Sequence, residues 1–117
     1  IRVSLFIDAD KKQIDAAMAC GAPVIEIHTG HYADAVSSVE RELKYNEIKK
    51  ACKYAHNLGL QVNAGHGLTL ENTFAIAKID SIVELNIGHS IISRAVFVGL
   101  ANATTEMKAL MLEARGL

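Results

Sequence analysis

The sequence lacks the features that mark membrane, secreted and nucleic-acid-binding proteins. No apolar run in the 117 residues approaches the ~20 that a membrane-spanning helix needs, and no charged leader with a small-residue cleavage site opens the chain. Twelve lysines and arginines against thirteen acidic residues give a net charge of -1, which leaves no electrostatic surplus for binding nucleic acid or anionic lipid. These absences favour a cytoplasmic protein with small-molecule partners.

Cysteines and cofactor motifs are also scarce. Cys20 and Cys52 fall in helix-like segments without the close spacing of a disulfide framework, so we expect buried free thiols. Neither a P-loop nor the glycine fingerprint of dinucleotide-binding domains occurs. His28 and His31 lie close together, but no cysteine or carboxylate spacing completes a zinc-ligand set. The sequence therefore predicts neither a metal site nor a nucleotide cofactor.

What the sequence does contain is an alternation of short β-branched runs with longer helical segments. This alternation predicts an α/β fold of parallel strands joined by crossover helices, and no proline- or serine-rich linker divides it. We expect strands over residues 3–7, 24–28, 61–64 and 82–87. We expect helices over residues 11–20, from a capping box at Ser37 to about 59, from 69 or 71 through 77, over about 91–97 and over 103–115.

Two local features qualify these helices. Asp10 is the expected N-cap of the first helix, with Gln13 three residues later as its capping-box partner. In the long second crossover, the step from Leu43 to Ile48 breaks the 3.6-residue period. We therefore expect a kink or two separate helices near residues 45–46.

The ends of the chain suggest a piece of something longer. Residue 1 already lies inside a strand pattern, whereas residues 103–115 read as a finished helix that stops at Gly116. Four βα units are half of an eight-unit TIM barrel, so we expect a half-barrel that ends near the true C-terminus. A flavodoxin-like open sheet is the alternative, and length alone favours it.

Polar side chains at the strand ends argue for the barrel, because βα folds gather their functional groups there. Three of the five histidines, His28, His66 and His89, lie at such exits. Strand alternation places Glu26 and His28 on one face, which would be the barrel interior. A carboxylate there must be hydrogen-bonded, ion-paired or functional, and a structural ion pair remains the alternative for Glu26.

Two glycine-flanked histidines are the strongest chemical candidates. Gly65-His66-Gly67 lets the backbone bend sharply and leaves space beside an imidazole, the side chain type whose ordinary pKa lies nearest neutrality. His66 is thus a candidate general acid or base, with an incidental tight turn as the alternative. Gly88-His89-Ser90, before a short helix, is a candidate anion cradle of backbone N–H groups.

Four strand-end strings together resemble the pyridoxine 5'-phosphate synthase family. They are SLFIDAD at residues 4–10, IEIHTGHYA at 25–33, VNAGHGLT at 62–69 and ELNIGHSII at 84–92, and the resemblance continues to LMLEARG at 110–116. The family is a TIM barrel that closes a pyridine ring from 3-amino-2-oxopropyl phosphate and 1-deoxy-D-xylulose 5-phosphate, releasing phosphate and water. The resemblance implies that residues 1–117 are strands five to eight, the C-terminal half of a single barrel domain.

The resemblance also implies residue roles. His66 matches the family's proton donor and Glu26 its transition-state-stabilising acid, while Gly67, Gly88 and His89 match contacts to the aminoketone phosphate. The family's other catalytic histidine and glutamate, and its residues for the second substrate, lie in the first four strands, so the fragment alone is expected to be inactive. The resemblance implies no cofactor and a homo-oligomer, octameric where known.

Two other functions stay open at this point. The chain could be a non-enzymatic βα module that binds a phosphorylated metabolite, alone or assembled with another polypeptide. It could also belong to another TIM-barrel enzyme that acts on a sugar phosphate.

Overall fold

The computed structural model describes all 117 residues and contains one sheet of four parallel strands in the order β1-β2-β3-β4. The strands are β1 (Ser4–Ile7), β2 (Val24–His28), β3 (Gln61–Gly65) and β4 (Ile82–Asn86). The helices are α1 (Lys11–Ala19), α2 (Gly30–Ala33), α3 (Ser38–Asn57), α4 (Thr73–Ala77), α5 (His89–Val98) and α6 (Leu100–Ala114). The predicted α/β class, parallel pairing and sequential strand order are confirmed. No helix is both long and apolar enough to cross a membrane.

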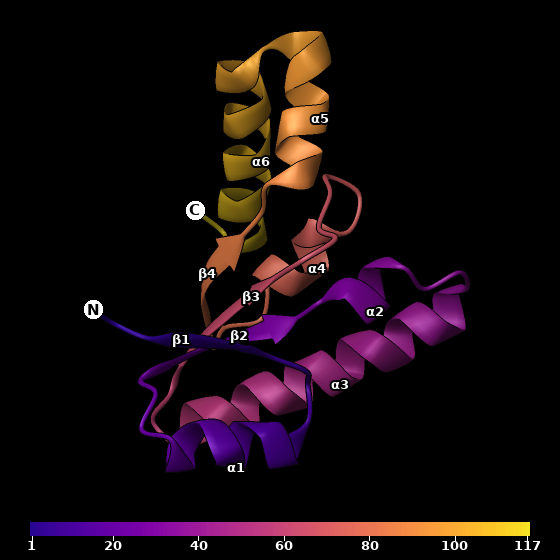
Figure 1. Cartoon of the computed structure of the whole chain (residues 1–117). Coiled ribbons are helices and arrows are strands. Elements are labelled where there is room, and N and C mark those ends of the chain that lie inside the picture. The colour runs from indigo at the N-terminus through magenta and orange to yellow at the C-terminus, as the bar shows by residue number, and fades with distance from the viewer.

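The strand register gives the sheet two chemically different faces. Leu5, Ile25 and Val62 share one row, and such apolar rows face the helices, with α1 and α3 along one side of the sheet (Figure 1). The alternate row consists of Phe6, Glu26, Asn63 and Glu84. On this second face Phe6 is 53% exposed and Glu84 is exposed, so no helix covers it.

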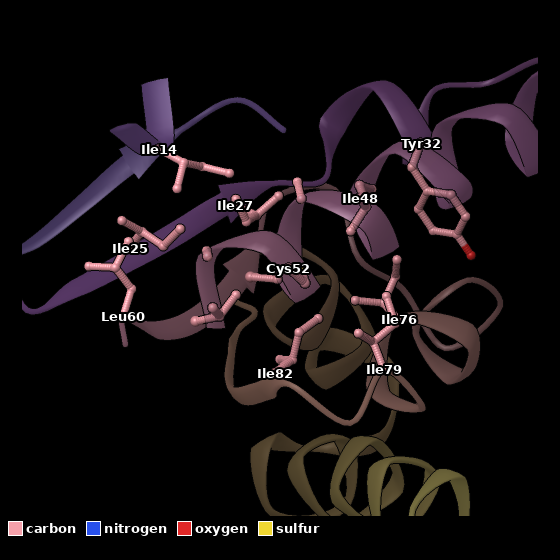
Figure 2. Packing of buried hydrophobic residues seen from close by; sticks show 14 of the residues in the cluster. Ile14, Ile25, Ile27, Tyr32, Ile48, Cys52, Leu60, Ile76, Ile79 and Ile82 are labelled. Atoms are coloured by element: carbon pink, nitrogen blue, oxygen red, sulfur yellow. The ribbon is translucent and has the colours of Figure 1, made fainter. Parts of the chain in front are cut away.

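A single apolar core lies between the sheet and its helices. Ile14 of α1 and Ile48 and Cys52 of α3 pack with Ile25 and Ile27 of β2, as Figure 2 shows. Burying one such isoleucine contributes about 1.5–3 kcal/mol. Packing of these apolar rows against the helices therefore holds the strands in place, together with the segments that follow them.

The long helix α3 is continuous through residues 45–46, so the expectation of two separate helices there is wrong. Its buried stripe begins at Ile48, whereas Leu43 is 58% exposed and points to solvent. The apolar period breaks because Leu43 is a surface residue that does not belong to the buried stripe, and the helix continues through this point. The start at Ser37 is confirmed, because its hydroxyl accepts a hydrogen bond from the Glu40 N–H at 3.1 Å.

The start of α1 is also confirmed, but its capping box is not. The Asp10 carboxylate accepts a hydrogen bond from the Lys12 N–H at 3.1 Å. Gln13 reaches past Asp10: its Oε1 accepts from the Asp8 N–H at 2.8 Å, and its Nε2 donates to the Asp8 carboxylate at 3.4 Å. Gln13 therefore ties the end of β1 to α1.

Other helix boundaries differ from the prediction. The one-turn helix α2 was not expected, and α4 begins only at Thr73 because the Thr69 N–H donates to the Asn72 side chain in a preceding turn. The helices α5 and α6 are longer than predicted and are separated only by Gly99, whose φ is +84°. They form a hairpin that projects from the sheet (Figure 1), with the Arg94 guanidinium donating two hydrogen bonds to the Glu106 carboxylate.

Both outer strands of the sheet present unpaired edges. In the order β1-β2-β3-β4 the outer edge of β4 has no partner strand, and Val83, which bulges out of the register with β3, is 69% exposed. At the opposite edge, Val3 and Phe6 are 49% and 53% exposed. Unpaired apolar edges pair readily with other strands.

Residues 1–117 expressed alone should therefore self-associate. Size-exclusion chromatography with light scattering should detect species larger than the monomer that grow with protein concentration. Val83→Lys places a charge on the β4 edge and should shift the population toward monomer. Leu43→Lys, at a comparably exposed position on α3, is the matched control and should not. A concentration-independent monomer with one cooperative melting transition would contradict this expectation.

The two cysteines are free, as predicted, but only one is buried. Cys52 is fully buried in the core, and burial raises the pKa of its thiol to about 12. The expectation that Cys20 is buried is wrong, because it lies at the C-cap of α1 and faces solvent. Only a thiolate is strongly nucleophilic, so the two side chains should differ in reactivity.

An alkylating reagent applied to the folded protein near pH 8 should label Cys20 and leave Cys52 unmodified until denaturant is added. Peptide mapping by mass spectrometry identifies the modified residue. Cys20→Ser should remove labelling of this segment in the native state, whereas Cys52→Ser should leave it unchanged. Equal labelling of both thiols in folded protein would show that the core opens more readily than its burial indicates.

Candidate functional site

All five residues predicted for the site line one cavity. It has a volume of about 510 Å³ and lies at the carboxyl ends of the strands. The predicted residues in its lining are Glu26, His66, Gly67, Gly88 and His89, and the others are Phe6, Leu68, Thr69, Asn86, Ile87 and Ser90. The lining contains carboxylate, imidazole and amide groups but no lysine or arginine.

The Glu26 carboxylate is held by its neighbours on the second face of the sheet. Its Oε2 accepts a hydrogen bond from Asn86 Nδ2 at 2.9 Å. A side chain at Gly65 would overlap the other carboxylate oxygen, so glycine at 65 makes room for it. No lysine or arginine of the chain forms an ion pair with Glu26. The carboxylate is thus oriented by an amide and remains partly exposed toward the cavity.

His66 has an unusual backbone conformation. Its φ is +87°, and no other non-glycine residue of the chain has a positive φ. The left-handed region costs an ordinary L-residue of order 1–3 kcal/mol, and such outliers concentrate at functional sites. His66 directly follows β3, and its imidazole is exposed at the cavity.

The ring of His28 lies beside the ring of His66, with 4.8 Å between their centroids. His28 Nδ1 accepts a hydrogen bond from the Gly30 N–H at 2.9 Å, so a neutral ring carries its proton on Nε2. A side chain at Gly30 would overlap His28 Cε1 and would lie 3.1 Å from His66 Cδ2. The glycine at 30 therefore permits the two imidazoles to approach each other.

The loop after β3 has its backbone carbonyls bonded to the surrounding protein. The Thr29 hydroxyl lies 2.7 Å from the Gly65 carbonyl oxygen and 2.6 Å from that of His66. Asn72 Nδ2 donates to the Gly67 carbonyl at 3.2 Å, and the Ser90 hydroxyl donates to the Leu68 carbonyl at 2.6 Å. These bonds fix the conformation of the loop.

A tyrosine braces the same loop from α2. The Tyr32 hydroxyl donates to the Asn72 carbonyl at 2.8 Å. Burial raises the pKa of the Tyr32 phenol above its ordinary value, so the hydroxyl keeps its proton and its role as donor. The β2 exit turn and the β3 exit loop therefore form one connected unit.

The amide groups of the rim are left without acceptors. No hydrogen bond within the chain uses the N–H groups of Gly67, Leu68 or Gly88. Gly88 is the N-cap of α5 and has no side chain to satisfy the first helical turn, whose N–H groups lack intrahelical partners. The helix dipole adds positive potential at this end. This arrangement has the donors that the predicted anion cradle requires.

Several residues of this site were not identified from the sequence. Thr29 and Tyr32 act through contacts 36 to 40 residues away in the chain, which no local pattern reveals. The Asn72 side chain contacts the loop only five residues away, at Gly67. Asn86 was open to prediction, since strand alternation puts it on the same face as Glu84 and Glu26. No group of three histidine, cysteine or acidic side chains is placed to hold a metal ion.

Comparison with known proteins assigns the chain to a family. A sequence profile described as "Pyridoxal phosphate biosynthesis protein PdxJ" matches residues 1–113. Relatives named pyridoxine 5'-phosphate synthase are 62% identical in Colwellia psychrerythraea, 61% in Coxiella burnetii and 58% in Photobacterium profundum, each over 115 residues and 98% of this chain. The matches cover 47 or 48% of those proteins, so the chain spans about half the length of the curated relatives it matches. A match that runs through residue 113 at this level of identity shows that the chain belongs to the PdxJ family of pyridoxal phosphate biosynthesis proteins.

Proposed function

We propose that the chain is the second half of a pyridoxine 5'-phosphate synthase, strands five to eight of a TIM barrel. The first half would pair with the edges of β1 and β4 and close the barrel over the second face of the sheet. The exposed Phe6, Glu84 and Val83 on that face and edge support this placement, since an intact barrel has neither an open face nor an edge. So does the chain's length, about half that of its relatives.

The observation that carries the function is the single cavity that gathers a carboxylate, an imidazole and a set of free backbone amides. The reaction joins 3-amino-2-oxopropyl phosphate with 1-deoxy-D-xylulose 5-phosphate, with loss of water and inorganic phosphate. Condensation, dehydration and ring closure all move protons between carbon, nitrogen and oxygen. Groups that donate and accept protons beside a bound phosphate ester are what this chemistry requires.

The phosphate of the aminoketone is assigned to the rim formed by Gly67, Gly88 and His89. Amide N–H groups without internal acceptors and the N-terminus of the ten-residue helix α5 favour an anion there. The absence of lysine and arginine from the cavity lining leaves the binding of this phosphate to amides, the helix dipole and His89 within this half of the protein. Further charge would come from the other half.

His66 is assigned as proton donor and Glu26 as the acid that stabilises the transition state. Both border the same space, and Asn86 orients Glu26 so that one carboxylate oxygen is directed over Gly65, next to His66. One positioned acid–base group contributes typically ~10²–10⁴-fold to a rate. The chemistry of these two residues needs no cofactor, and the remaining catalytic groups would come from strands one to four.

Assembly and location are part of the same proposal. The resemblance to the family favours a cytoplasmic homo-oligomer, an octamer in which each barrel carries one such site. Its ligands are phosphorylated small molecules, and neither nucleic acid nor membrane is involved.

Gly88→Val in the polypeptide encoded by the complete gene should weaken binding of the aminoketone phosphate at least tenfold and leave the melting temperature nearly unchanged. A Cβ at Gly88 meets no atom within 4 Å and the φ of -125° is negative, so the fold has space for the new side chain, which fills the cradle. Gly88→Ala should have a smaller effect on affinity. Unchanged affinity in both variants, measured by calorimetry, would show that this turn does not bind phosphate.

The proposed function itself is tested by synthesis of pyridoxine 5'-phosphate from the two substrates, followed by mass spectrometry. His66→Asn should retain folding and aminoketone phosphate binding while turnover falls ~10²–10⁴-fold, because asparagine keeps a polar side chain and tolerates the left-handed conformation but exchanges no proton near neutral pH. His56→Asn, at an exposed position at the end of α3, is the matched control and should keep full activity.

Two results would refute these assignments separately. Binding of the phosphate ester with no product from the unmodified protein would favour a non-enzymatic binding module. Near-normal turnover in folded His66→Asn would remove His66 from the mechanism and leave the function intact.

A further inference from the structure

We propose that Thr29 is a positioning residue that holds His66 in its left-handed backbone conformation and so fixes the direction of the imidazole in the cavity. The effect on turnover rests on the proposed function, whereas the effect on backbone conformation does not. Thr29 does not line the cavity, and its hydroxyl reaches the site only through the backbone carbonyls of Gly65 and His66.

The left-handed conformation of His66 needs support from outside the residue. A histidine at φ +87° is strained, while a glycine at the same position would not be. The preceding strand β3 fixes Gly65, and the turn continues through Gly67 at φ +74°. The chain thus places a side chain at a position where glycine would be more stable.

The Thr29 hydroxyl provides this support at the carbonyl of His66. Thr29 is fully buried, and its hydroxyl lies 2.6 Å from the His66 carbonyl oxygen and 2.7 Å from that of Gly65. The Gly65 carbonyl already accepts the Thr29 N–H at 2.8 Å, but no backbone N–H donates to the carbonyl of His66. The hydroxyl is therefore the group that satisfies this carbonyl and fixes the orientation of the peptide that follows His66.

The Thr29 hydroxyl bonds the His66 carbonyl although its position would also allow it to cap helix α2. Thr29 is the N-cap residue of α2, a position where threonine ordinarily accepts a hydrogen bond from the first helical turn. Here its side chain makes no capping bond and instead crosses to the neighbouring strand exit. Thr29 therefore makes a hydrogen bond to a residue 37 positions away in place of the usual capping bond.

Neighbouring groups confine the imidazole once the backbone is set. The ring of His28 lies 4.8 Å from that of His66, and His28 is itself held by the Gly30 N–H. If His66 adopted an ordinary negative φ, its carbonyl would leave the Thr29 hydroxyl and its Cα–Cβ bond would change direction relative to β3 and the ring of His28. Misplacing a catalytic group by about 1 Å can cost on the order of 10²-fold in rate.

Thr73 provides a matched control for the variants. It is also a fully buried threonine, and its hydroxyl donates to the Thr69 carbonyl at 2.6 Å while its N–H bonds the same carbonyl at 3.1 Å. Thr29→Val and Thr73→Val therefore each remove a hydroxyl-to-carbonyl hydrogen bond from a fully buried site. Only the first touches the backbone of His66.

The first experiment compares melting temperatures in the polypeptide encoded by the complete gene, with histidine or glycine at position 66. His66→Gly alone should raise the melting temperature by about 2–4 °C, because it relieves the strain. Thr29→Val should lower it in both backgrounds but less with His66 present, because the strained backbone of His66 can then relax and offset part of the lost hydrogen bond, whereas glycine at 66 has no strain to release. Thr73→Val should lower it equally in both backgrounds.

Equal losses for Thr29→Val in the two backgrounds would overturn the proposal, since Thr29 would then be an ordinary structural residue. If Thr29→Val alone does not fold, the double variant with His66→Gly should recover folding. Failure of that double variant to fold would count against the proposal in the same way.

The second experiment measures steady-state synthesis of pyridoxine 5'-phosphate. Thr29→Val should reduce kcat about tenfold to a hundredfold and should also raise the KM for the aminoketone phosphate, because the peptide that the hydroxyl holds carries the Gly67 N–H. Thr29→Ser, which keeps the hydroxyl, should restore most of both. Thr73→Val should keep kcat. Equal kcat for Thr29→Val and the unmodified protein would overturn the positioning role, whereas absence of activity in the unmodified protein would overturn only the proposed function and leave the melting experiment to decide.

Discussion

The site depends on the close contact between the turn that follows β2 and the loop that follows β3. Parallel pairing brings His28 level with Gly65, so the two exits begin at the same height above the sheet. At Gly30 and Gly65 a side chain would overlap the imidazole of His28 or the carboxylate of Glu26. Glycine at these two positions allows the turn after β2 and the loop after β3 to pack closely together. The hydrogen bonds of Thr29 and the ring contact between His28 and His66 exist only because the two segments approach this closely.

The strands and the cavity lining could be predicted from the sequence because both follow from local periodicity. Alternation along residues 24–28 places Glu26 and His28 on one face, and parallel βα folds align their strand exits at one edge. Once the strands are assigned, His66, Gly88 and His89 necessarily meet there. The predicted site residues therefore share one cavity although they lie far apart in the chain.

Features that depend on packing between distant segments could not be predicted in this way. The period of α3 breaks at Leu43 because that residue faces solvent, a fact that depends on where the sheet ends and not on the helix itself. Gln13 matches a capping-box pattern, yet its side chain bonds Asp8, which directly follows β1. Thr29 resembles any N-cap threonine in sequence, and only the neighbouring strand exit reveals where its hydroxyl is directed.

The bonding of the loop after β3 has a consequence for how this site can change during evolution. Its carbonyls accept hydrogen bonds from Thr29, Asn72 and Ser90, while the amides of Gly67 and Leu68 have no acceptor within the chain. A donor that belongs to the main chain is present whatever side chain the codon specifies, proline excepted. A substitution in this loop is therefore tolerated only if the new residue can adopt the same backbone angles as the residue it replaces. The ligand recognition proposed for this rim depends on backbone conformation, which a search of the sequence for charged residues would overlook.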